Sequence, residues 1–124
     1  PELDNLTILL AEDNRVNQTI FRATIKPTHA KVDIAQDGLA AIDYMSKHTP
    51  DIIFMDIQMP KLDGVGACVA IKKTHPNIPI IALTANVMTE DVAHYEKVGF
   101  DGYIAKPIEL NKLYTVLKKF KGSE

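Results

Sequence analysis

The chain has 124 residues, of which 46% are hydrophobic and 24% charged, with a single cysteine and a formal net charge of −2. These values indicate one globular domain over residues 1–124 and exclude an internal disulfide and a zinc site built from several cysteines. The chain has no long run of one charge, no apolar run of about 18 residues and no signal peptide, so we expect a cytoplasmic domain that contacts neither nucleic acid nor a membrane. Because it begins at Pro1 rather than at a methionine, we expect a piece of a longer protein.

Five short apolar segments alternate with five segments of helical periodicity. The third apolar segment, Ile52 to Met55, is unbroken and predicts a strand buried on both faces, whereas Ala30 to Ala35 alternates and predicts a strand exposed on one side. The predicted strands are residues 6–11, 30–35, 52–55, 78–83 and 103–105, and the predicted helices are residues 15–26, 39–47, 64–75, 90–98 and 110–120. This alternation predicts an α/β doubly wound fold, a five-stranded parallel sheet covered by helices on both faces, with its core over about residues 6–120.

Local signals support the predicted helix ends. Asn14 offers a cap at the start of the first helix, and Pro27 prevents that helix from continuing. Asp37-Gly38 is a turn signal before the second helix, Asp63-Gly64 opens the third, and Gly99 is a natural stop for the fourth.

Four of the predicted strands end in side chains with reactive or polar groups. Glu12 and Asp13 follow the first strand, Asp56 the third, Thr84 the fourth and Lys106 the fifth. Since parallel strands end at the same edge of a sheet, we expect these side chains to converge. Each one alone has an ordinary interpretation as a helix cap or loop residue, but their coincidence on four strand ends favours a functional site.

The expected cluster of three carboxylates requires a cation, because close carboxylates repel and raise one another's pKa. Oxygen ligands without a histidine or cysteine cluster favour Mg²⁺, with Mn²⁺ as the alternative, over zinc. A cation, a lysine and a hydroxyl around Asp56 suit a phosphoryl group, which a carboxylate can carry as an acyl phosphate. We therefore expect Asp56 to be a nucleophile, Glu12 and Asp13 to bind the metal, and the backbone carbonyl of Gln58 to be a further ligand.

These residues resemble those of the receiver domains of two-component response regulators. The resemblance extends from Leu6 to Phe120 and rests on five motifs in family order, Ala11-Glu12-Asp13-Asn14, Met55-Asp56-Ile57-Gln58-Met59-Pro60, Asp63-Gly64, Leu83-Thr84-Ala85 and Ala105-Lys106-Pro107. It implies a flavodoxin-like (βα)5 fold with strand order 2-1-3-4-5 and a cis bond between Lys106 and Pro107.

The resemblance also implies a reaction. Asp56 accepts a phosphoryl group from a phosphohistidine on a histidine kinase or a histidine phosphotransfer domain. Mg²⁺ is held by four groups, namely Glu12, Asp13, Asp56 and the Gln58 carbonyl, while Thr84 and Lys106 contact the phosphoryl oxygens. The domain is then a signalling module that catalyses only its own phosphorylation and dephosphorylation, and not an enzyme with a separate substrate.

A switch is implied as well, with Thr84 and Tyr103 as its residues. Movement of Thr84 toward the phosphoryl group vacates space that Tyr103 fills from an outward rotamer, which changes the face formed by the fourth helix, fifth strand and fifth helix. The ordinary alternative for Tyr103 is a half-buried tyrosine on an edge strand. Gln58 and Asn86 flank the site and are expected to influence the rate of hydrolysis.

Two motifs bear on the parent protein. The segment from Glu12 to Gln18 and the sequence Leu83-Thr84-Ala85-Asn86 are similar to those of receivers in hybrid histidine kinases. The expected parent is therefore such a kinase, which can be membrane-anchored, and a free-standing response regulator is the alternative.

Other functions of the same fold fit less well. A phosphatase of the haloacid-dehalogenase type requires a second acid two residues after its nucleophile, where this chain has Gln58. A nucleotide or flavin site lacks the glycine-rich loop that it needs after the first strand. A binding module that never turns over phosphate does not need the acid cluster.

A few further residues have simple interpretations. Val16 and Ile20 belong to the core or form a docking site for a phosphotransfer helix bundle, with the core favoured. Cys68 is expected in the core. The four histidines are expected at the surface, namely His29, His48, His75 and His94.

Overall fold

The structure is a computed structural model that describes residues 5–85 and 88–121. Asn86, which was expected beside the site, lies outside the described residues. The strands are β1 (Thr7–Ala11), β2 (Lys31–Ala35), β3 (Ile52–Asp56), β4 (Ile80–Thr84) and β5 (Gly102–Ala105). The helices are α1 (Arg15–Ile25), α2 (Gly38–Met45), α3 (Gly64–Thr74), α4 (Thr89–Val98) and α5 (Leu110–Lys121), with a 3-10 turn η1 (Lys26–Thr28) after α1.

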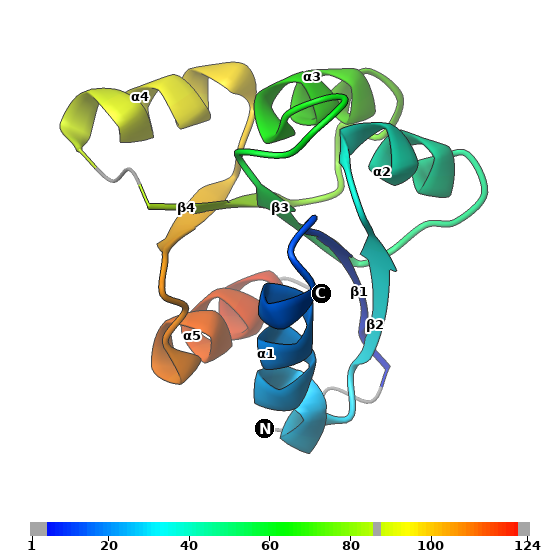
Figure 1. Ribbon diagram of the computed structural model, residues 1–124, viewed down its shortest axis with the longest axis vertical. Helices are drawn as coiled ribbons and strands as arrows, with labels where there is room; N and C mark the ends of the chain where they lie inside the picture. The colour runs from blue at the N-terminus through cyan, green and yellow to red at the C-terminus, as the bar shows by residue number, and fades with distance from the viewer. Residues whose placement is uncertain (1–4, 86–87, 122–124) are drawn as a thin grey trace.

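All five predicted strands are present, and all pair in parallel in the order β2-β1-β3-β4-β5 (Figure 1). The predicted fold class and strand order are therefore confirmed. The alternating segment 31–35 lies at one edge of the sheet. β4 begins at Ile80, later than predicted, because Pro79 has no N–H to donate to the ladder.

The helices cover both faces of the sheet. Figure 1 shows α2, α3 and α4 on one face and α1 and α5 on the other. Alternate strand residues divide accordingly between two apolar cores. Ile81 and Leu83 of β4 belong to the core under α1 and α5, whereas Ile80 and Ala82 belong to the core under α2, α3 and α4.

Capping side chains, of which only Asn14 was predicted, position the helices that follow the strand ends. Asn14, Asp37 and Asp63 each accept a hydrogen bond from the backbone N–H three residues later, at 3.0, 2.7 and 2.8 Å. These bonds satisfy N–H groups that a helix leaves unpaired in its first turn. α1, α2 and α3 therefore begin at fixed places beside the carboxyl ends of the strands.

Exposure corrects some of the individual predictions. Val16 and Ile20 are 65% and 52% exposed, so the favoured core interpretation was wrong; Phe21 and Ile25 are the α1 residues that turn inward. Cys68 is buried, as predicted. The histidines are exposed except His75, which is half-buried. Among the described residues, no helix is both long enough and apolar enough to cross a membrane.

Candidate functional site

Three carboxylates gather at the carboxyl ends of β1 and β3. Glu12 and Asp13 follow β1, Asp56 is the last residue of β3, and one oxygen from each of the three lies within 4.8 Å of the others. Glu12 and Asp56 are buried, with 2% and 6% exposed, while Asp13 faces solvent. The site therefore has two enclosed carboxylates and one open to water.

Lys106 brings a positive charge to this cluster from the end of β5. Its ammonium nitrogen lies 3.1 Å from Asp56 Oδ1 and 3.3 Å from Glu12 Oε1. The peptide bond that follows, Lys106–Pro107, is cis. One cation thus contacts two buried carboxylates that come from different strands.

The charges in the cluster shift the ionisation of Glu12. Burial raises the pKa of Glu12 above its ordinary value, and the negative charge of Asp56 raises it further. The Asn14 N–H, which donates to Glu12 Oε2 at 3.1 Å, and the charge of Lys106 oppose this rise. An additional cation at the cluster would favour the ionised form of Glu12.

The oxygen cluster fits a magnesium ion. Mg²⁺ binds oxygen at about 2.0–2.1 Å, so ligands on opposite sides of one ion lie about 4 Å apart. Oxygens of Glu12, Asp13 and Asp56 lie within 4.8 Å of one another, so they would have to move closer to bind one ion, to about 4 Å for a pair on opposite sides of it and about 3 Å for neighbours. Gln58 lies two residues beyond Asp56, and its N–H donates to Asp56 Oδ1 at 3.3 Å.

Gly64 shapes the loop that leaves Asp56. Its N–H donates to the Ile57 carbonyl at 2.8 Å, which folds the loop back on the end of β3. A Cβ at this position would overlap the Asp56 carbonyl oxygen. Only glycine therefore allows the start of α3 to approach the backbone of Asp56 this closely.

Thr84 ends β4 with its side chain buried at 3% exposure. Its hydroxyl lies 2.8 Å from the hydroxyl of Tyr95, a buried residue of α4. Thr84 pairs with Ala105 in the sheet, and Asp56 pairs with Leu83, so Thr84 lies one position beyond Asp56 along the strand direction.

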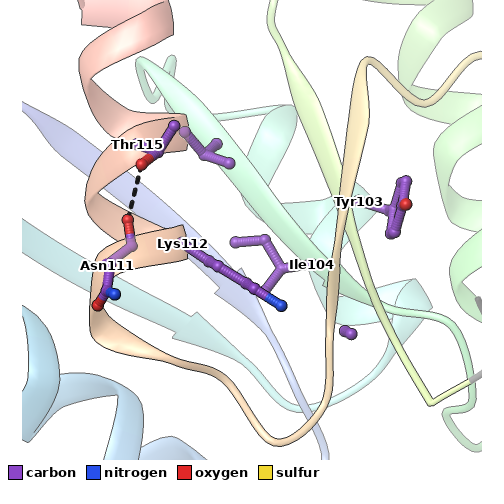
Figure 2. Close-up of a pocket in the computed structure, with 7 residues that line it drawn as sticks. Tyr103, Ile104, Asn111, Lys112 and Thr115 are labelled. Carbon is purple, nitrogen blue, oxygen red and sulfur yellow. Dashed lines mark hydrogen bonds between the residues drawn. The ribbon is translucent and has the colours of Figure 1, made fainter.

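Tyr103 lies on the outer strand β5 and is 42% exposed. Figure 2 shows its ring on the opposite side of β5 from Ile104 and Lys112. A hollow of about 510 Å³ lies between β5 and α5, and seven residues line it, namely Tyr103, Ile104, Ala105, Asn111, Lys112, Thr115 and Val116 (Figure 2). Tyr103 is therefore exposed on the outer strand, and its role in a switch stays a prediction.

A smaller hollow of about 120 Å³ lies beside the acid cluster, on the α1 side. Its lining includes Glu12 and Lys106 of the cluster together with Ile20 and Pro107. The exposed Ile20 side chain therefore borders the entrance to the charged residues.

The response regulator receiver domain family matches residues 8–118. The chain belongs to this family. It is therefore a receiver domain of two-component and phosphorelay signalling, as the resemblance implied.

The receiver is similar to proteins of two kinds. It is 40% identical over 119 residues to hybrid signal transduction histidine kinase I of Dictyostelium discoideum, covering 89% of this chain and 7% of that kinase. It is 32% identical over 118 residues to the polar-differentiation response regulator DivK of Brucella anthropi, covering 94% of this chain and 96% of DivK. The receiver spans only 7% to 18% of the length of the kinases and transcription factors that it matches.

Solved receiver structures superimpose closely. The receiver domain of a sensor histidine kinase from Pseudomonas aeruginosa, solved with a magnesium ion coordinated in its active site cleft, has a TM-score of 0.87 and 35% identity, covering 94% of this chain and 98% of that one. The receiver domain of Saccharomyces cerevisiae Ssk1, solved with the histidine phosphotransfer protein Ypd1, has a TM-score of 0.87 and 25% identity, covering 93% of this chain and 88% of that one.

Two residues beside the receiver's site were not expected there from the sequence. Tyr95 was not singled out, and Gly64 was expected only within the Asp63-Gly64 motif that opens the third helix. The pair Asp63-Gly64 directly after a strand-end loop was the available signal for Gly64. No local pattern marks Tyr95, since its contact with Thr84 joins residues 11 positions apart on different elements.

Proposed function

We propose that Asp56 of this receiver is the phosphoacceptor and that its donor is a phosphohistidine on a partner protein. The observation that supports this most directly is the contact of Lys106 with both Asp56 and Glu12, at 3.1 and 3.3 Å, beside an exposed Asp13. A carboxylate held by a cation within an acidic cluster is arranged for phosphoryl transfer rather than for simple structural pairing.

A divalent cation completes the proposed site. Glu12, Asp13, Asp56 and the Gln58 carbonyl would hold Mg²⁺, which neutralises phosphoryl charge when bound. The magnesium in the related Pseudomonas aeruginosa receiver supports this assignment. Mn²⁺, which prefers similar ligands, is the second ion to test.

In the proposed reaction, an Asp56 carboxylate oxygen forms a bond to phosphorus while the bond from phosphorus to the donor's histidine nitrogen breaks. The electron pair of that bond stays with the imidazole nitrogen. Lys106 offsets charge on the transferring group, and the Thr84 hydroxyl donates a hydrogen bond to one phosphoryl oxygen. Most of the rate enhancement then comes from positioning and charge neutralisation.

The response is proposed to follow from Thr84 and Tyr103. Phosphorylation adds a charge of about −1.5 to −2 and strong acceptor oxygens. Thr84 turns toward them, Tyr103 moves inward from its exposed position, and the face of α4, β5 and α5 changes. Moving such a switch from 1:99 to 99:1 requires about 5.5 kcal/mol of differential interaction.

The proposed partners are a histidine kinase, a histidine phosphotransfer domain, or both. The Ssk1 complex with Ypd1 supports a phosphotransfer partner, and the exposed Val16 and Ile20 of α1 offer it an apolar docking surface next to the site. The small net charge of −2 supports our proposal that this domain contacts neither nucleic acid nor a membrane.

Two kinds of full-length protein could contain this receiver. Identity to hybrid kinases favours a receiver within a hybrid histidine kinase, whereas the near-complete match to DivK favours a free-standing response regulator. We favour the kinase, because its identity of 40% exceeds the 32% of DivK. The proposed location of the domain is the cytoplasm.

Incubation with acetyl phosphate and Mg²⁺, followed by intact-mass measurement, tests the assignment. We expect one added phosphoryl group on the native chain and on Asp43→Asn, a matched change at an exposed aspartate of α2. We expect none on Asp56→Asn. Equal incorporation by Asp56→Asn would reject the phosphoacceptor assignment, and continuous turnover of a generic phosphate ester would favour a haloacid-dehalogenase-type phosphatase instead.

A further inference from the structure

Tyr95 links the proposed phosphoryl site to α4 through a contact between two hydroxyl groups. Its hydroxyl lies 2.8 Å from the Thr84 hydroxyl, and both side chains are buried, with 5% and 3% exposed. A hydrogen bond between buried hydroxyl groups offsets part of the cost of removing them from water. The bond crosses from the end of β4 to the middle of the neighbouring helix.

The alternation of strand residues explains why Thr84 meets α4. Leu83 belongs to the core under α1 and α5, so Thr84, the next residue, starts on the α4 side of the sheet. Met55 belongs to the core on the α4 side, so Asp56 starts on the side of α1 and α5. The Thr84 hydroxyl must therefore turn over the edge of the sheet to reach a phosphoryl group on Asp56.

Such a turn is incompatible with the present contact. A threonine side chain moves between staggered rotamers, and one step carries its hydroxyl oxygen by about 2 Å. The separation of 2.8 Å from Tyr95 leaves no slack for a displacement of that size. Tyr95 cannot easily follow, because its ring is packed edge-on against Phe100, with centroids 6.0 Å apart and planes at 80°.

We propose that the Tyr95 hydroxyl holds Thr84 on the α4 side in the unphosphorylated receiver and is released when Thr84 turns to a phosphoryl group on Asp56. This inference rests on the proposed role of Asp56. Tyr95 is then a positioning residue, since it acts on the site through Thr84. Because Tyr95 belongs to α4, loss of its bond to Thr84 transmits phosphorylation directly to that helix.

The same arrangement connects Tyr95 with the proposed switch. Tyr95 and Tyr103 line one hollow of about 600 Å³ between α4, β5 and α5, together with Phe100 and Phe120. Inward movement of Tyr103 would change the shape of a hollow that Tyr95 also lines. The two tyrosines therefore border the same hollow, and Tyr95 also contacts Thr84.

The test measures the affinity for beryllofluoride, a phosphoryl mimic, in the presence of Mg²⁺ by NMR titration. In Tyr95→Phe the competing bond is absent and the ring remains, so we expect binding to tighten by about 2- to 10-fold, the worth of one hydrogen bond. The matched control is Tyr44→Phe, since the Tyr44 hydroxyl also donates a hydrogen bond, to Asp33 at 2.6 Å, far from Thr84. We expect that control to bind as the wild type does.

A double-mutant cycle separates the holding role from a general effect on packing. The gain in beryllofluoride affinity from Tyr95→Phe must vanish in a Thr84→Ala background. It must persist in a Thr84→Ser background, because serine keeps the hydroxyl. Unchanged or weakened binding by Tyr95→Phe, or the same gain in Thr84→Ala, would overturn the holding role.

A second readout requires no phosphoryl chemistry. In the metal-free protein, we expect the methyl resonance of Thr84 to shift in Tyr95→Phe and to stay in place in Tyr44→Phe. An unshifted resonance in Tyr95→Phe would overturn the holding role alone. A wild-type receiver that binds no beryllofluoride would overturn the proposed function of Asp56, and the holding role with it.

Discussion

Lys106 Nζ lies 3.1 Å from Asp56 Oδ1, which joins the ends of β5 and β3 across the intervening strand β4. Replacing Lys106 by Ala removes this cation, and we expect phosphorylation by acetyl phosphate to slow by about 100-fold or more, the usual loss when one group that stabilises developing charge is removed. Mass spectrometry over a time course measures the rate. Lys112→Ala, at an exposed lysine of α5, should react at the wild-type rate, and a similar rate for Lys106→Ala would contradict the role of that charge.

Magnesium should stabilise the folded receiver. The three carboxylates lie within 4.8 Å of one another only in the folded chain, so Mg²⁺ binds the native state preferentially. At 100 times its dissociation constant, the ion should raise the free energy of unfolding by about 2.7 kcal/mol. Thermal unfolding with and without Mg²⁺ measures this gain. Asp13→Asn should lose most of it, whereas Asp43→Asn should keep it; an equal gain in both variants would reject the carboxylate site.

Substitution of Gly64 should lower both the stability of the fold and the rate of phosphorylation. A Cβ there overlaps the Asp56 carbonyl oxygen, so Gly64→Ala forces the loop after β3 to move. We expect a loss of about 1–3 kcal/mol in the free energy of unfolding and slower phosphorylation well below the melting temperature. At Gly102 a Cβ would meet only the end of the Ile81 side chain, at 3.4 Å. Gly102→Ala should therefore cost little in denaturant unfolding and keep the wild-type rate; equal effects at both positions would contradict this explanation.

The exposed apolar residues of α1 should matter only to protein donors. Ile20 borders the hollow beside Lys106, so Ile20→Arg places a bulky charge at the proposed docking surface. We expect phosphoryl transfer from a histidine phosphotransfer protein to slow at least 10-fold, the effect of losing about 1.4 kcal/mol of docking energy, while acetyl phosphate still reacts normally. Leu39 of α2 is equally exposed, at 52%, so Leu39→Arg is the matched control. Equal slowing by both variants would reject this surface.

The only cysteine provides a test by pH. Burial raises the pKa of the Cys68 thiol to about 11, from an ordinary value of 9.0. Since the folded thiol holds its proton more tightly than the unfolded one, the contribution of Cys68 to stability is complete below about pH 9 and declines as the pH rises toward 11. Denaturant unfolding across this range should show a smaller decline for Cys68→Ala than for the wild type. Parallel declines would contradict the raised pKa.

The fold and the acid cluster could be predicted because they depend on patterns along the chain. Short apolar runs alternating with helical periodicity specify a parallel sheet, and the strand-end rule places Glu12, Asp56 and Lys106 at one edge. The observed distances of 3.1 and 3.3 Å from Lys106 to Asp56 and Glu12 agree with that predicted convergence. The side chains at the ends of strands are therefore the part of this site that can be predicted from the sequence.

Contacts that depend on the rotation of a helix about its axis could not be predicted in the same way. α1 carries the apolar residues Val16, Ile20, Phe21 and Ile25, and periodicity alone does not say which of them face the sheet. The bond between Thr84 and Tyr95 depends on how α4 packs against β4, which neither segment specifies by itself. These features required the three-dimensional packing.

The opposite directions of Leu83 and Thr84 have a consequence for tolerance to insertions. One residue added within β4, before Leu83, would move Leu83 into the position of Thr84. A hydrocarbon side chain would then face α4 in place of the hydroxyl. The carboxylates and Lys106 belong to other strands and would keep their places. A domain altered in this way would still accept a phosphoryl group on Asp56, but α4 would no longer respond to it. A shift of register in a single strand would therefore separate phosphorylation from the conformational response.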